Sequence, residues 1–165
     1  MPPEPSTASR LCAACGMCCN GVLFHAGVLQ EGDSERALSA LGLKIKRRGS
    51  PPHFLQPCTA HRDSHCTIYD QRPQRCRLFN CRQLLRVATG DITESAALEK
   101  IHEAKSRTAR VENLIDRLAE TNPRRALAQR CANALTGTEA NPLHAELKSA
   151  MSELEALLKT DFRVE

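Results

Sequence analysis

Cysteine is the residue type whose number and spacing indicate chemistry in this chain of 165 residues, which contains nine. Two-residue gaps within the first cluster allow two sulfur atoms to reach one metal ion from a tight turn, and Gly16 gives that turn its flexibility. The spacing therefore predicts thiolate metal ligands, with zinc or iron as the ion. Eight cysteines form the two clusters: Cys12, Cys15, Cys18, Cys19, Cys58, Cys66, Cys76 and Cys81.

Spacing alone does not choose the metal. Four thiolates make a closed tetrahedral zinc site, whereas a C-x2-C-x2-C run with a distant fourth cysteine also holds iron–sulfur clusters. The ferredoxin pattern is only partly matched, because Cys19 follows Cys18 directly. Two four-thiolate sites, one iron–sulfur cluster with spare thiols, and a binuclear centre all remain open.

Adjacent side chains of an extended segment point to opposite faces, so Cys18 and Cys19 are expected to serve two sites, or one of them to support the ligands or act as a redox thiol. In a helical arrangement Cys12, Cys15 and Cys19 would share a face, with Cys18 beside it. The ninth cysteine, Cys131, is predicted to be a small core residue of a helix.

Two histidines, His61 and His65, flank the turn between Cys58 and Cys66. They are the best nitrogen ligands if a thiolate is spare, although a surface histidine is the simpler interpretation for each.

The second cluster lies in a longer pattern, Cys-x7-Cys-x-Ile-Tyr-x2-Arg-Pro-x2-Cys-Arg-x-Phe-x-Cys. Together with Cys-x2-Cys-x2-Cys-Cys, it resembles the bacterial CxxCxxCC cysteine-cluster family, described as a zinc- or iron-chelating domain. The resemblance covers residues 12–81 and implies metal binding through all eight cysteines. Flagellin lysine methylases have a similar cluster pattern, which implies an alternative role as an iron–sulfur redox or transferase enzyme.

Three residues of the pattern are candidates for supporting the ligands: Tyr69, Arg72 and Arg77. The arginines would offset the negative charge of a thiolate centre and donate N–H groups to sulfur. Tyr69 and Arg72 would fix the short helix that presents Cys76.

No Gly-rich phosphate loop, metalloprotease helix or Ser/His/Asp arrangement is present, so the sequence leaves open whether the protein is an enzyme and names no catalytic residue. Residues 44–86 have a net charge of +8, which suggests nucleic-acid binding as a weaker alternative. Aromatic residues make up only 3% of the chain, too few for a platform on which bases stack.

Neither a secretory signal nor an apolar run of about 20 residues is evident, so no membrane association is expected. With an odd number of cysteines, this predicts a reducing, cytoplasmic location.

The expected fold is α+β and mostly α, with a disordered tail (1–10), a metal-binding domain with short strands (11–86) and an antiparallel helical region (87–165). The helical region would be a scaffold or a partner surface. Apolar spacing and capping residues predict helices over Thr93–Glu120, from Asn122-Pro123 to near Gly137, and from Asn141-Pro142 through Leu158, with a tail or edge segment over Leu158–Val164.

The first half has weaker signals. Strands are predicted over Gly21–Val28 and His53–Gln56. A helix is predicted after Asp33 or Ser34, ending at Gly42, and another over Asp70–Phe79 with Asp70 as its N-cap.

Overall fold

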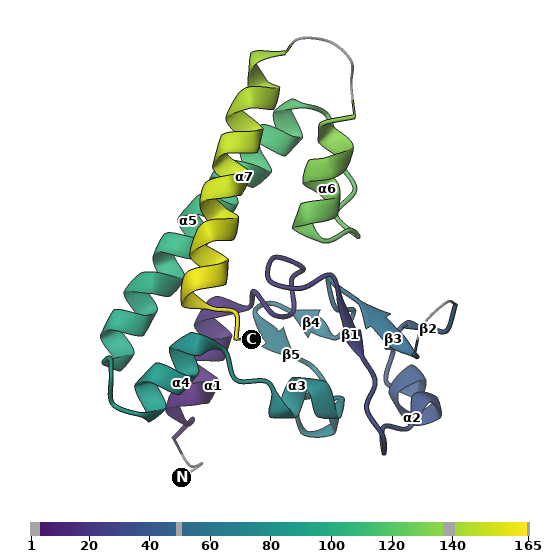
Figure 1. The fold of residues 1–165 in the computed structure, drawn as a ribbon. Helices are drawn as coiled ribbons and strands as arrows, with labels where there is room; N and C mark the ends of the chain where they lie inside the picture. The colour runs from purple at the N-terminus through teal and green to yellow at the C-terminus, as the bar shows by residue number, and fades with distance from the viewer. Residues whose placement is uncertain (1–3, 49–50, 137–140, 165) are drawn as a thin grey trace. The chain divides into compact units, whose positions relative to one another are not determined.

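The computed structural model describes residues 4–48, 51–136 and 141–164, and it consists of helices and two small antiparallel sheets (Figure 1). This confirms the predicted α+β, mostly α, class. The described residues divide into two compact units. We call them the helical unit (within residues 1–15, 80–122 and 129–165) and the sheet unit (residues 16–79 and 123–128, as far as they are described).

The helical unit is built on two long helices, α5 (Glu94–Arg117) and α7 (Pro142–Asp161). They pack side by side in opposite directions (Figure 1). Thr93 and Asn141 cap their first turns through side-chain oxygens, as the sequence predicts. The apolar faces form a fully buried core that includes Ile101, Val111, Ile115, Leu147, Leu154 and Leu158.

The end of α7 corrects one expectation. Residues 158–161 belong to the helix rather than to a tail or an edge segment, and Phe162, the residue after the helix, is 1% exposed. The buried Phe162 ring stabilises the last turn of α7, which the spacing of apolar residues in the sequence does not indicate.

Helix α1 (Thr7–Cys15) was not expected, because residues 1–10 were predicted to be a disordered tail. Three prolines and a lack of apolar residues hide the helix in the sequence. Its stability comes instead from other parts of the helical unit. Leu11 is 1% exposed, and Arg10 donates two hydrogen bonds, of 2.8 and 2.7 Å, to the Glu94 carboxylate of α5.

Helix α6 (Leu127–Ala134) starts four residues after Pro123, the predicted first helical position. The N–H of Leu127 instead donates to the carbonyl of Gly21 over 2.9 Å. Gly21 permits this approach because a Cβ there would lie 3.0 Å from the Cα of Ala126. The predicted end near Gly137 lies outside the described residues.

The larger sheet of the sheet unit has the strand order β1-β3-β2, with both pairs antiparallel. Its strands are β1 (Ala26–Val28), β2 (Ile45–Lys46) and β3 (His53–Leu55). Gly27 lies opposite Phe54 in the register. The strand predicted from Gly21 begins only at Ala26, because the N–H groups of Val22 and Leu23 are used in turns, bonding Asn20 Oδ1 and the Met17 carbonyl.

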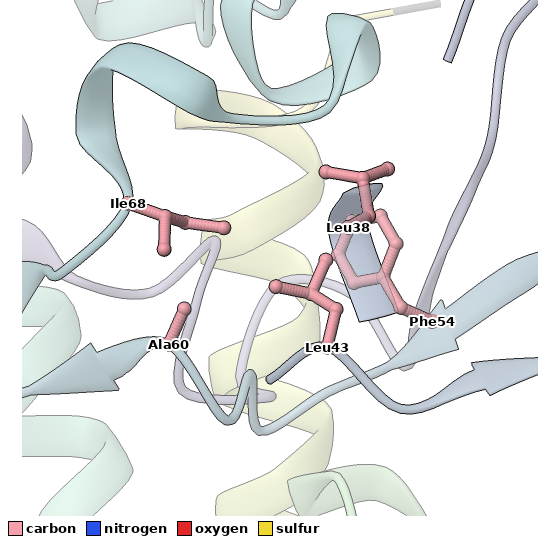
Figure 2. Close-up of a cluster of buried hydrophobic side chains, with 5 residues drawn as sticks. All are labelled: Leu38, Leu43, Phe54, Ala60 and Ile68. Atoms are coloured by element: carbon pink, nitrogen blue, oxygen red, sulfur yellow. The ribbon is translucent and has the colours of Figure 1, made fainter. Parts of the chain in front are cut away.

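Phe54 belongs to the apolar cluster of this unit, with Leu38, Leu43, Ala60 and Ile68 (Figure 2). Leu38 comes from α2 (Glu35–Ala40), which Ser34 caps as predicted. Three half-buried cysteines pack against the cluster: Cys58, Cys66 and Cys76. The small core of this unit is therefore partly made of thiols.

A two-stranded hairpin joins β4 (His61–Arg62) to β5 (His65–Cys66), and the sequence analysis did not predict it. Both turn residues, Asp63 and Ser64, have positive φ angles of 48° and 64°. Two such residues make the tightest hairpin connection, for which Asn-Gly is the common sequence signal. Asp-Ser carries that signal only weakly, which is why the hairpin was missed.

The helix predicted over Asp70–Phe79 is broken in two. A 3₁₀ turn, η1 (Tyr69–Gln71), precedes α3 (Gln74–Leu78). Arg72 is extended, with a ψ of 148°, because Pro73 disfavours the helical conformation in the residue before it. The N-cap role predicted for Asp70 is therefore wrong, and the N–H of Gln74 donates to Asp33 Oδ1 instead.

Candidate metal centre

The sheet unit positions three cysteines of the second cluster from three different segments. Cys58 follows β3 in the turn that leads to β4, Cys66 ends β5, and Cys76 lies in the middle of α3. All three are half-buried against the same apolar cluster. Residues separated by up to 18 positions are thus brought to one place by the hairpin and the short helix.

The electrostatics of these thiols indicate a site that favours a cation. The pKa of Cys76 is raised to about 11, mainly by burial and then by negative charge on Cys58 and Cys66, against the opposing charge of Arg72. Burial also raises the pKa of Cys58, with Cys66 adding to it. The thiolate forms are therefore disfavoured until a positive ion offsets their charge.

Cys58 also has backbone support. The backbone N–H groups of Ala60 and His61 favour the thiolate form and oppose the rise of its pKa. The N–H of Cys58 itself donates to the carbonyl of Cys19 over 2.7 Å. This bond fixes the second half of the N-terminal cluster next to the start of the second cluster.

Cys18 and Cys19 lie in a turn that begins at Gly16, whose carbonyl accepts from the N–H of Cys19 over 3.0 Å. Gly16 has a φ of +67°, and helix α1 ends just before it. The helical arrangement in which Cys19 shares a face with Cys12 and Cys15 is therefore wrong. Cys12 and Cys15 lie on α1 alone, one exposed and the other half-buried.

Cys81 is the N-cap residue of α4 (Arg82–Ala88) in the helical unit. Burial raises the pKa of its thiol, while the backbone N–H groups of Leu84 and Gln83 oppose that rise. The residues that follow it are attached to the end of α7. The Arg82 N–H donates to the Phe162 carbonyl over 2.9 Å, and Gln83 Nε2 donates to the Asp161 carbonyl over 2.7 Å.

Tyr69, Arg72 and Arg77 brace the break between η1 and α3. The Arg72 guanidinium lies 3.6 Å from the centroid of the Tyr69 ring, and its Nε donates to the Tyr69 carbonyl. Arg77 donates to the carbonyls of Arg72 and Asp70. Arg72 also acts on Cys76 through its charge. A direct bond from these residues to sulfur stays a prediction.

The ninth cysteine, Cys131, lies on α6 and is 5% exposed. This burial agrees with the predicted core role. Asp33 was predicted only as an alternative cap of α2, which Ser34 caps; its contact with the start of α3 was not predicted.

The sulfur donors fit zinc or iron chemically, since both metals bind thiolates. The arrangement is not preformed, however. Among the residues that the structure describes, no three histidine, cysteine or carboxylate side chains are placed so that they could hold one metal ion. Metal binding would require the thiol groups to turn toward a common point.

Comparison with known proteins agrees with these donors. Residues 11–132 match the model of the family "CxxCxxCC: Putative zinc- or iron-chelating domain". No curated protein and no solved structure matches the chain. Within the described parts of the chain, no helix has the length and apolar character needed to cross a membrane.

Proposed function

Because the chain belongs to the CxxCxxCC family, we propose that it is a metal-chelating protein whose cysteine thiolates hold zinc or iron. One observation supports this most directly. Three half-buried thiols, Cys58, Cys66 and Cys76, lie close enough for their negative charges to disfavour one another. A divalent cation removes that penalty by displacing the thiol protons.

The proposed ligands are the eight clustered cysteines. Five belong to the sheet unit, namely Cys18, Cys19, Cys58, Cys66 and Cys76, and three to the helical unit, namely Cys12, Cys15 and Cys81. Zinc would be held by thiolates in closed four-coordinate geometry, whereas iron would add the redox chemistry of a thiolate-bound cluster.

Binding is expected to be coupled to local ordering. Since the thiols do not converge as they stand, the free energy of metal binding must also order the turn before β4 and the helix α3. The apolar cluster beneath them is small, so the metal would supply stability that this core lacks.

The test is metal analysis of the full chain purified without oxygen. We expect zinc or iron in the wild-type protein and a loss of bound metal in Cys58→Ser, Cys66→Ser and Cys76→Ser. The matched control is Cys131→Ser, which changes a cysteine that we place outside the centre and should keep the metal content. Wild-type protein without zinc or iron, even after anaerobic reconstitution, would refute the proposal.

The same preparation identifies the metal. Broad visible absorption with acid-labile sulfide indicates an iron–sulfur cluster, whereas a colourless protein that contains zinc indicates a structural site.

A further inference from the structure

The half-buried imidazole of His61 is a donor that the cysteine pattern does not include. Its Nε2 is inaccessible to solvent and has no hydrogen-bond partner within the described structure. A buried polar nitrogen without a partner is costly, so its position calls for an explanation.

The hairpin places His61 directly opposite Cys66. Because Asp63 and Ser64 form a two-residue turn, Arg62 and His65 close it, and the next pair along is His61 with Cys66. The pair after that is hydrogen-bonded, since the Thr67 N–H donates to the Ala60 carbonyl over 2.8 Å. His61 and Cys66 therefore form a non-hydrogen-bonded pair, in which Cα atoms are about 4.5 Å apart and side chains are closest.

His61 is equally close to Cys58 along the chain. Two residues separate them, and the His61 N–H donates to the Cys58 carbonyl over 3.1 Å. This is the spacing at which two ligands reach one ion from a tight turn. The imidazole is thus joined to one thiol by the turn and faces a second across the hairpin.

The Cε1–Nε2 edge of the ring lies next to Gly16, where the turn of the N-terminal cluster begins. A Cβ added to Gly16 would lie 3.4 Å from both Cε1 and Nε2 of His61. Gly16 begins the turn that carries Cys18 and Cys19, so the imidazole lies between that turn and the hairpin. Within the described structure this nitrogen has no hydrogen-bond partner, and the residue opposite His61 in the hairpin is a cysteine.

We propose that His61 Nε2 is a metal ligand, acting with the thiolates of Cys58, Cys66 and Cys76. One nitrogen and three sulfurs make the Cys3His donor set of structural zinc sites. The inference rests on the proposed metal-binding function and deepens it, because it adds a nitrogen donor to a set otherwise made of cysteines.

The experiment is anaerobic titration of the metal-free full chain with Co²⁺, which reports its ligands by visible absorption. Wild-type protein should show thiolate charge-transfer bands. His61→Ala should bind at least about tenfold more weakly and show shifted ligand-field bands, while His61→Cys should restore binding with an additional sulfur donor. The matched control is His65→Ala, whose exposed ring bonds the Asp63 carbonyl and should leave the spectrum unchanged.

A second measurement does not depend on any variant folding. In histidine-¹⁵N-labelled wild-type protein, Zn²⁺ should convert the His61 Nε2 resonance to that of a metal-bound nitrogen and leave that of His65 Nε2 unchanged. An Nε2 that stays protonated, or unaffected, in zinc-loaded protein would overturn the inference while the metal-binding function stands. Absence of any Co²⁺–thiolate band in the wild-type protein would instead overturn the proposed function.

Discussion

Asp33 and Gln74 are joined by a hydrogen bond of 2.9 Å from the backbone N–H of Gln74 to the carboxylate Oδ1 of Asp33. The other oxygen of the same carboxylate accepts from the Gln30 N–H over 2.8 Å. The first N–H groups of a helix have no partner within it. Asp33 therefore supplies, from 41 residues away, the cap of the helix that carries Cys76.

Removal of this carboxylate should loosen α3. We expect Asp33→Ala to lower the free energy of unfolding by about 1–2 kcal/mol, the usual effect of losing a helix cap, and to weaken metal binding through Cys76. The control is Asp70→Ala, which removes the exposed carboxylate that sequence rules select as the cap and should change stability by less than about 0.5 kcal/mol. Urea unfolding measures both, and equal losses in the two variants would contradict this account.

Gly27 is a position where even one methyl group does not fit. A Cβ there would lie 2.3 Å from Cζ of Phe54, a ring that is 2% exposed. Gly27→Ala should therefore displace Phe54 from the cluster and cost about 1–3 kcal/mol of stability. Val28→Ala, a neighbouring change at a side chain that is 42% exposed, should have a much smaller effect in the same denaturant titration.

The attachment of α1 should depend on pH. Hydrogen bonds from Arg10 hold the pKa of Glu94 below its ordinary value of 4.5, with a smaller contribution from Thr7, and Glu4 also acts on Arg10. A carboxyl whose pKa is lower in the folded chain stabilises the fold above its unfolded pKa. That stability is lost as the pH falls through the folded value.

We therefore expect Glu94→Gln to be less stable than wild type near neutral pH, with the difference vanishing below the folded pKa of Glu94. Denaturant unfolding as a function of pH measures this difference, and added salt should shrink it because the pair is exposed. Glu99→Gln, at an exposed position of the same helix, serves as the control. A Glu94→Gln difference that persists unchanged in acid would show that the ion pair is not its cause.

Metal removal should act locally. Chelation is expected to reduce hydrogen-exchange protection of the Thr67 and Cys58 amides, whose bonds to Ala60 and Cys19 hold the second cluster in place. Amides of α5 around Val111 should stay protected because the buried core of the helical unit includes none of the eight clustered cysteines. If chelation reduced the protection of the Thr67, Cys58 and α5 amides equally, or reduced none of them, a metal held by these thiols would be contradicted.

The long helices could be predicted because their signals are local. Thr93 and Asn141 provide caps, and the apolar spacing of each helix matches its buried face. The predicted domain limits at residues 10 and 86 stay predictions, as does the eight-cysteine ligand set.

What could not be predicted depends on distant partners. Helix α1 is held by the burial of Leu11 and by the Arg10–Glu94 ion pair. The start of α6 is held by a hydrogen bond to the Gly21 carbonyl, and the start of α3 by a hydrogen bond to Asp33. No pattern within these segments reveals such contacts. His61 lies between these cases, since its proximity to Cys58 is visible in the sequence but its register with Cys66 is not.

The bonds from Arg82 and Gln83 to Phe162 and Asp161 bear on how this protein can be shortened. The segment matching the family ends at residue 132, ten residues before α7 begins. A fragment cut at that point would keep all eight clustered cysteines, yet it would expose the apolar face of α5 and remove the acceptors that hold the residues after Cys81. A fragment can therefore contain all eight clustered cysteines and still be too short to hold Cys81 in place.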